Sequence, residues 1–207
     1  MLHNKIGNNV FLDRSVDLYS HDYYYGFRST ENTLRYINYL KNDCRDFDAV
    51  ITQCEDKAAS VLSADLSDLV RIYGPLTVCG IPRSKREDVY HSSMMGFKRA
   101  LHKAVAMNQN LHNGIDYIVR HTNTLCTHRS YFGYGGDGES PRRGLMRDTC
   151  HISAAVAEKN IILVDDIYTL GVGIDEDGVQ ALFEAGARNV IMYTFGYTVN
   201  RRYCKCA

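Results

Sequence analysis

The 207-residue chain lacks a net charge, because 24 lysines and arginines balance 24 aspartates and glutamates. A protein that binds polyanions non-specifically needs a basic excess, so nucleic acid is not an expected partner. No apolar run approaches the roughly 20 residues that a membrane helix requires. The first residues, Met1 to Lys5, are not followed by an apolar signal segment. These absences predict a cytoplasmic protein without membrane contact.

Patterns typical of metal sites and disulfide frameworks are also missing. The seven cysteines are scattered and include no Cys-x-x-Cys pair, which argues against a structural zinc site and against a disulfide scaffold. The eight histidines include no His-x-x-x-His pair. Tryptophan is absent, but 15 tyrosines are present, three of them consecutive at 23–25. Such a set favours an adhesive face and hence a homo-oligomer.

The first third of the chain predicts an irregular arm followed by helices. Residues 1–29 are rich in Tyr, Asn and Asp and are expected to form an irregular arm or a hairpin. A short amphipathic helix should follow Thr30. Over 46–73, apolar residues recur at steps of three and four, which predicts one continuous helix. The Gly-Pro pair at 74–75 should end it.

Strands and helices alternate after this break, which predicts a parallel sheet with right-handed crossovers. Strands are expected over 76–81, 115–119, 160–165 and 190–195, and helices over 94–107 and 176–185. Residues 133–144 hold six glycines and prolines and should form an irregular or functional loop. We therefore expect an α/β core of four or five strands over 76–207. Residues 1–75 would be part of the same domain or a small appendage.

The segment over 161–173, IILVDDIYTLGVG, carries the most chemistry. Its apolar residues predict a buried strand, Asp165 and Asp166 end that strand, and a loop of small residues leads into a helix. Open parallel sheets bind ligands at the carboxyl ends of their strands. A loop that exposes backbone N–H groups at a helix N-terminus suits a phosphate. Acids beside such a loop can hold ribose hydroxyls or a magnesium ion.

This segment resembles the phosphoribosyl-pyrophosphate (PRPP) signature of the type I phosphoribosyltransferases. The resemblance implies a type I phosphoribosyltransferase-like central parallel sheet flanked by helices, with a helical and irregular N-terminal region before it. It implies that the two acids hold the ribose of PRPP and that the loop holds its 5′-phosphate. The PRPP-binding residues would be Asp165, Asp166, Tyr168, Thr169, Leu170, Gly171, Val172 and Gly173.

A basic segment follows the strand expected at 76–81, where family members have a pyrophosphate-binding loop. Cations and backbone amides after a strand end suit a diphosphate leaving group. The alternative is a basic surface turn. The pyrophosphate-binding residues implied here are Arg83, Ser84, Lys85 and Arg86.

The arrangement most resembles the ComF-type, or predicted amidophosphoribosyltransferase-like, branch of the family. Residues 95–99 lie where that branch has a Gly-Phe-Asn-Gln motif, and Arg120 resembles an arginine of its following strand. Arg142, Arg143 and Arg147 resemble the basic residues of its mobile loop, which would close over the substrate. The catalytic residues implied are Asp165, Asp166, Arg142, Arg143 and Arg147.

Three positions of the loop bear on the substrate. Gly173 stands where the family loop ends in Thr or Ser, so one hydroxyl donor is missing, although glycine allows close approach. Leu170 replaces a small polar residue. Purine-salvage members carry an Asp at the position of Thr169, and its absence argues against hypoxanthine or guanine as the acceptor.

The expected function is transfer of phosphoribose from PRPP to an unidentified amine or nitrogen base, with release of pyrophosphate. The chain would be a phosphoribosyltransferase with Mg²⁺ as its cofactor, held by Asp165 and Asp166 directly or through water. Two alternatives stay open. One is a non-catalytic regulatory protein that binds PRPP or a nucleotide, which Gly173 favours. The other is a ComF-type accessory protein associated with nucleic acid, which the zero net charge disfavours.

Overall fold

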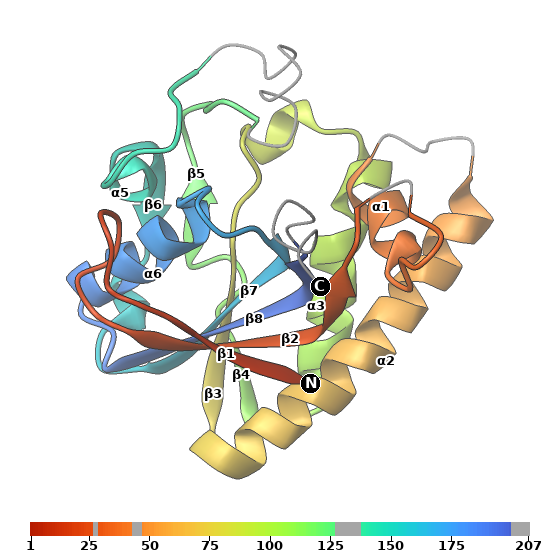
Figure 1. Cartoon of the computed structure of the whole chain (residues 1–207), viewed down its shortest axis with the longest axis horizontal. Coiled ribbons are helices and arrows are strands. Elements are labelled where there is room, and N and C mark those ends of the chain that lie inside the picture. The colour runs from red at the N-terminus through yellow and green to blue at the C-terminus, as the bar shows by residue number, and fades with distance from the viewer. Residues whose placement is uncertain (27–28, 43–46, 127–137, 200–207) are drawn as a thin grey trace, which may run out of the picture.

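The computed structural model describes residues 1–26, 29–42, 47–126 and 138–199. Its centre is a sheet with the strand order β1-β2-β8-β7-β3-β4 (Figure 1). The strands are β1 (Leu2–Ile6), β2 (Val16–Tyr24), β3 (Leu76–Gly80), β4 (Leu111–Asn113), β7 (Asn160–Tyr168) and β8 (Asn189–Thr198). All neighbours pair in parallel except the edge strand β1, which is antiparallel to β2. The fold is therefore α/β with a six-stranded, mostly parallel sheet.

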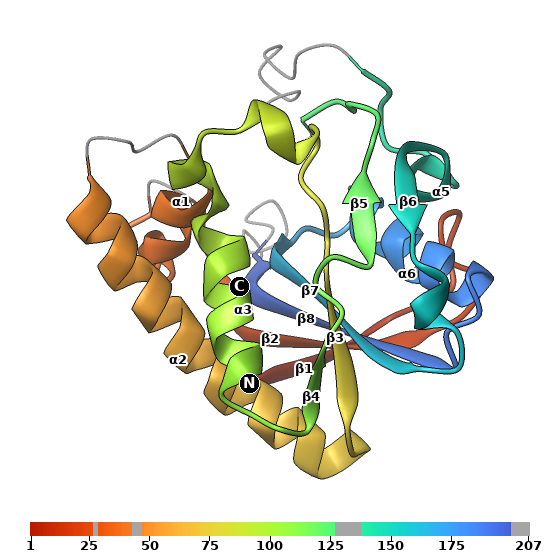
Figure 2. The same cartoon turned by 180° about the vertical axis from the view of Figure 1, so that it is seen from behind.

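Helices cover both faces of this sheet (Figures 1 and 2). One face carries α1 (Arg35–Lys41), α2 (Asp48–Tyr73) and α3 (Gly96–Ala106). The other carries α5 (Leu145–Thr149), α6 (Ile174–Glu184) and a small antiparallel pair, β5 (Ile118–Arg120) with β6 (Cys150–Ile152). Within the described ranges, no helix combines the length and the apolar character needed to cross a bilayer.

Alternation along β7 divides the core between these two layers. Ile162 and Val164 belong to the cluster on the side of α1, α2 and α3, whereas Ile161 and Leu163 belong to the cluster on the side of α6. Successive side chains of a strand point to opposite faces. Because both faces are covered, the strand has to be apolar throughout, as the run at 161–164 is.

The continuous helix expected over 46–73 is confirmed as α2. It ends at Gly74, whose φ of +77° favours glycine and whose N–H donates to the carbonyl oxygen of Val70. Pro75 cannot continue the helix, because its nitrogen carries no hydrogen. The helices expected over 94–107 and 176–185 are confirmed as α3 and α6, with small shifts at their ends.

The N-terminal arm has a larger role than the sequence indicates. β1 and β2 form the expected hairpin, and β2 also pairs in parallel with β8 over Leu18–Tyr24. β2 is polar and rich in tyrosine, so it lacks the apolar run that marks the other buried strands. The sheet consequently has six strands, whereas the sequence predicts four or five.

The strand expected at 115–119 is wrong. The strand that joins the central sheet is β4, which pairs with β3 from Leu111 to Asn113. β5 begins at Ile118 and pairs only with β6 in the separate small sheet. β4 is a short edge strand in which Leu111 alone is buried, so it has little apolar signal. Ile115 is buried by packing in the loop between β4 and β5.

Two aliphatic residues on α2 provide a matched test of this packing. Leu69 is completely buried, whereas Ile72 is 64% exposed. Leu69→Ala should lower the free energy of unfolding by about 2–5 kcal/mol, because it leaves a cavity in the core. Ile72→Ala should change it by less than about 0.5 kcal/mol. Urea denaturation of both variants measures the difference, and equal effects would contradict the orientation of α2.

Candidate functional site

A cavity of about 140 Å³ lies at the carboxyl ends of β3 and β7. β3 ends at Gly80, which is opposite Val164, whereas β7 continues beside β8 as far as Tyr168. Asp165 therefore stands just beyond the end of β3. The chain that leaves β3, Ile81 to Ser84, and Asp165 both line the cavity. This is the edge at which open parallel sheets bind ligands.

Lys41, in the last turn of α1, lies between the two acids of β7. Its Nζ is 2.6 Å from Oδ1 of Asp166 and 3.9 Å from Oδ1 of Asp165. Burial lowers the pKa of Lys41, but the charges of Asp166 and Asp165 outweigh burial, so the pKa lies above its usual value. Lys41 also lines the cavity. Sequence reasoning missed this residue, because it follows no motif and reaches the acids only through the packing of α1.

Buried carboxyl groups at this site outnumber the lysine. Asp175 and Glu176, in the first turn of α6, are 5% and 3% exposed. Oδ1 of Asp175 and Oε2 of Glu176 have no hydrogen-bond partner among the described residues. Burial and the neighbouring charge of Asp165 raise the pKa of Asp175. The cluster therefore contains carboxylate oxygens that only a proton or a further cation can neutralise.

A magnesium ion shared with a substrate fits this cluster of carboxylates better than one held by protein ligands alone. Mg²⁺ is usually bound by one or two carboxylates together with substrate phosphates and water, rather than by a cage of protein ligands. The described residues contain no group of three His, Cys, Asp or Glu side chains able to hold a metal by themselves. Asp165 borders the cavity and could bind the ion directly, whereas Asp166 is paired with Lys41 and would act through water.

The loop expected to bind a phosphate, Thr169 to Gly173, connects β7 to α6. Thr169 Oγ1 lies 2.8 Å from Oγ1 of Thr198, and Leu170 is 71% exposed. Val172 lies between two glycines with positive φ, +86° at Gly171 and +85° at Gly173. The next residue, Ile174, lines the cavity. The loop therefore lies beside the cavity at the N-terminus of α6, as a phosphate site requires.

Tyr168 lies in the core rather than in this loop. It is the last residue of β7 and is 1% exposed. Its hydroxyl donates to Oε1 of Glu176 at 2.8 Å, and its ring centroid lies 5.6 Å from that of Tyr197. Tyr168 therefore holds α6 against β7 and does not line the cavity. Its predicted contact with PRPP stays a prediction.

Phe11 explains why glycine occupies position 173. A Cβ atom built on Gly173 would lie 2.3 Å from Cζ of Phe11, in the connection between β1 and β2. The φ of +85° also disfavours any side chain. A threonine or serine, which the resemblance leads one to expect here, has neither the space nor the backbone conformation that it needs.

The predicted pyrophosphate segment divides into two parts. Arg83 and Ser84 line the cavity, whereas Lys85 and Arg86 are not among its lining residues. The Arg83 guanidinium donates to the carbonyl oxygens of Met94 and Lys41, both at 2.7 Å. Arg86 forms an ion pair with Asp88. Only the first part of the segment is therefore placed to meet a diphosphate.

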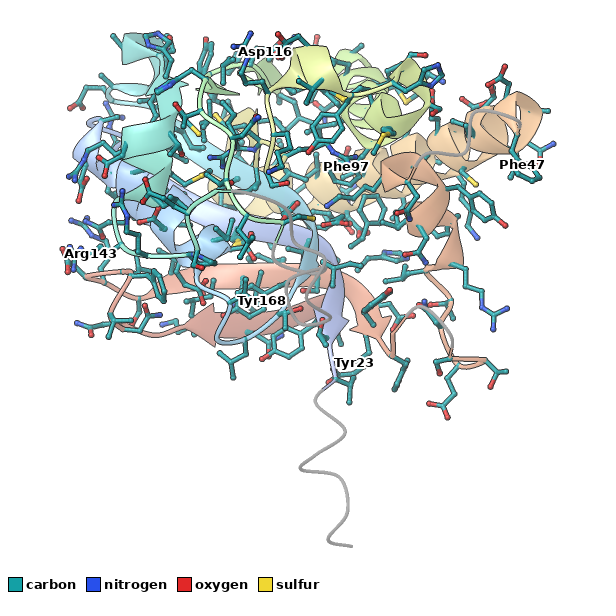
Figure 3. All side chains as sticks on the ribbon, turned by 90° about the horizontal axis from the view of Figure 1, so that it is seen from above. Tyr23, Phe47, Phe97, Asp116, Arg143 and Tyr168 are labelled. Atoms are coloured by element: carbon teal, nitrogen blue, oxygen red, sulfur yellow. The ribbon has the colours of Figure 1, made fainter. Side chains whose placement is uncertain are left out.

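The predicted loop arginines do not line the cavity. Their guanidinium groups form ion pairs elsewhere: Arg142 with Glu139 and Asp148, Arg143 with Asp13, and Arg147 with Asp148 and Glu184. Figure 3 shows Arg143 at the edge of the molecule, away from Phe97, which lines the cavity. Residues 133–137 of the predicted loop lie outside the described residues, whereas residues 138–144 are described. A catalytic role of the three arginines stays a prediction.

The structure thus brings Arg83, Ser84 and Asp165 together from two distant segments and adds Lys41 to them. No family model matches the chain, and no curated protein matches it.

The two loop glycines allow the contact with Phe11 to be measured. Gly171 has the same positive φ as Gly173, but a Cβ there would meet nothing within 4 Å. Gly171→Ala should lower the free energy of unfolding by about 1–2 kcal/mol through backbone strain alone. Gly173→Ala should lower it further, because Phe11 must move. In a Phe11→Ala background the two alanine variants should become alike by urea denaturation. An unchanged difference would contradict the contact.

Asp165 predicts a pH dependence of stability. Burial, opposed by the charge of Lys41, raises the pKa of Asp165 to about 7. An unfolded aspartate releases its proton near pH 4. Between these values the folded state holds a proton that the unfolded chain has lost, so this group's contribution to stability falls as the pH rises.

Asp165→Asn removes that titration. Relative to the wild type, the variant should therefore gain stability as the pH rises from about 4 to about 7. Free energies of unfolding measured at several pH values test this directly. Parallel curves for the two proteins would contradict the assignment.

Proposed function

We propose that this chain transfers a phosphoribosyl group from PRPP to an amine or a nitrogen base and releases pyrophosphate. The observation that carries the proposal is the meeting of two strand ends at one cavity. Arg83 and Ser84 follow β3, Asp165 lies in β7, and all three line the same space. The adjoining loop at the N-terminus of α6 adds backbone donors for a second phosphate. A ligand with a phosphate and a diphosphate on the two sides of a ribose matches this arrangement of donors.

The reaction requires little from a protein nucleophile. The bond from C1 of the ribose to the diphosphate oxygen breaks, and its electron pair leaves with the diphosphate. Positive charge builds on the ribose ring, as in glycoside cleavage, until the acceptor nitrogen forms a bond to C1. The surplus proton on that nitrogen passes to a diphosphate oxygen. Catalysis then depends on positioning and on electrostatic stabilisation.

The lining residues divide these tasks. Asp165 would accept hydrogen bonds from the ribose hydroxyls, and the loop from Thr169 to Gly173 would hold the 5′-phosphate through its N–H groups. Ser84 and the positive charge of Arg83 would hold the diphosphate. Arg83 is suited to this, because its contacts with two carbonyl oxygens fix it without neutralising its charge. Magnesium, when bound, would neutralise the charge that develops on the leaving group.

The architecture supports the same proposal at a coarser level. A mostly parallel sheet with helices on both faces suits a type I phosphoribosyltransferase-like fold, and the segment at 161–173 resembles the PRPP signature of that family. The resemblance to its ComF-type branch rests on residues 95–99, on Arg120 and on the arginines at 142, 143 and 147. A second candidate is a PRPP-binding regulatory protein without turnover. The contact between Phe11 and Gly173 favours it, because it excludes a hydroxyl donor from the phosphate loop.

Calorimetry and a pyrophosphate-release assay test the proposal together. The wild type should bind PRPP in the presence of Mg²⁺. Asp165→Asn should bind it at least tenfold more weakly, since one hydrogen bond to a charged group contributes about 1.5–3 kcal/mol. Asp68→Asn, the same chemical change on the exposed side of α2, should have no effect.

Pyrophosphate release with ammonia as the acceptor decides between the two candidates. Turnover that Asp165→Asn abolishes supports the transferase. Tight binding without release favours the regulatory protein. Absence of PRPP binding by the wild type would contradict both.

A further inference from the structure

Part of the cavity lining is apolar. It comes from α3, the turn before it, the segment between β4 and β5, and the first residue of β5. The side chains concerned are Met94, Met95, Phe97, Leu101, Ile115 and Ile118. An engineered apolar cavity of about 150 Å³ takes up benzene. A cavity of about 140 Å³ therefore has the size for one aromatic ring.

Arg120 lines the same cavity and is 4% exposed. Its Nε donates to the carbonyl oxygen of Arg83 at 2.6 Å, its Nη1 to Oγ1 of Thr149 at 2.6 Å, and its Nη2 to Sδ of Met146 at 3.1 Å. All three acceptors are neutral. Within the described residues Arg120 forms no ion pair with a carboxylate, and Asp177 acts on the guanidinium through its charge alone, without a hydrogen bond. A buried charge with neutral partners only is unfavourable.

The two lysines at the cavity, unlike Arg120, have carboxylate partners. Lys98 forms ion pairs with Glu87 and Asp116, and Lys41 forms one with Asp166. In the proposed function the diphosphate balances Arg83. Among the cations that line the cavity in the described part of the chain, Arg120 alone is then left without an anionic partner. An anion that enters the cavity would supply the missing partner.

We propose that the apolar cavity is the acceptor subsite and that it takes a single aromatic ring with an anionic substituent, whose charge Arg120 balances. The role of this site as the acceptor subsite rests on the proposed function, whereas the binding of a ring there does not. A ring nitrogen or an amino group of such a compound would form the bond to C1, with the diphosphate leaving as described above. The volume favours a single ring over two fused rings.

Binding of simple probes to the full chain without PRPP tests the ring site. We expect benzoate to bind, benzamide to bind at least tenfold more weakly, and 1-naphthoate not to bind, measured by ligand-observed NMR. Met95→Trp should abolish benzoate binding, because the half-buried Met95 lines the cavity and the larger indole would fill it.

Arg120→Gln should reduce benzoate affinity to that of benzamide while leaving benzamide affinity unchanged. Arg120→Lys keeps the charge and should keep the preference for benzoate, which guards against a variant that fails to fold. Equal affinities of the wild type for benzoate and benzamide would overturn the proposal. So would an Arg120→Gln variant that loses inorganic pyrophosphate binding but keeps benzoate, since Arg120 would then serve the diphosphate.

The outcomes separate this inference from the proposed function. Benzoate binding without any PRPP binding leaves the ring site standing and contradicts the transferase. Pyrophosphate release with aliphatic amines, together with no binding of benzoate, supports the transferase and overturns the ring site.

Discussion

The ion pair between Lys41 and Asp166 ties the end of α1 to the central strand β7, and the site depends on it. Three buried acids, Asp166, Asp175 and Glu176, gather with the partly exposed Asp165 where β7 passes the end of β3 and meets α6. Without the lysine, burial of this group would be strongly unfavourable. With it, Asp166 is neutralised, and Asp165 is left to face the cavity. The same contact places α1 across the strand ends, so that its carbonyl oxygen at Lys41 can anchor Arg83.

Much of the fold could be predicted from the sequence, because its signals are local. The helical period of α2 reflects burial of one face of the helix, and the apolar run of β7 reflects burial of both faces of the strand. β2 and β4 could not be predicted in this way. β2 is a polar strand that lies inside the sheet, between β1 and β8, and β4 contributes three residues to an edge. Their positions depend on pairing between distant segments, and such pairing produces no periodic pattern in the sequence.

The candidate site shows the same limit. Arg83, Ser84 and Asp165 follow strands in the sequence, so their meeting at one sheet edge could be expected from parallel topology. Lys41 could not, since helix packing alone brings it there. The apolar run predicts a strand that ends at Asp165, three residues before the end of β7, and so it places Tyr168 in the loop. No motif indicates the position of Phe11, yet Phe11 accounts for the glycine at a position where the phosphoribosyltransferases that the segment resembles have Thr or Ser.

A crystal structure with PRPP and magnesium tests the central claim most directly. The account predicts the diphosphate at Ser84 and Arg83, the ribose hydroxyls at Asp165, and the 5′-phosphate at the loop from Thr169 to Gly173. PRPP bound away from the cavity formed by the ends of β3 and β7, with Asp165 free of contact, would contradict it.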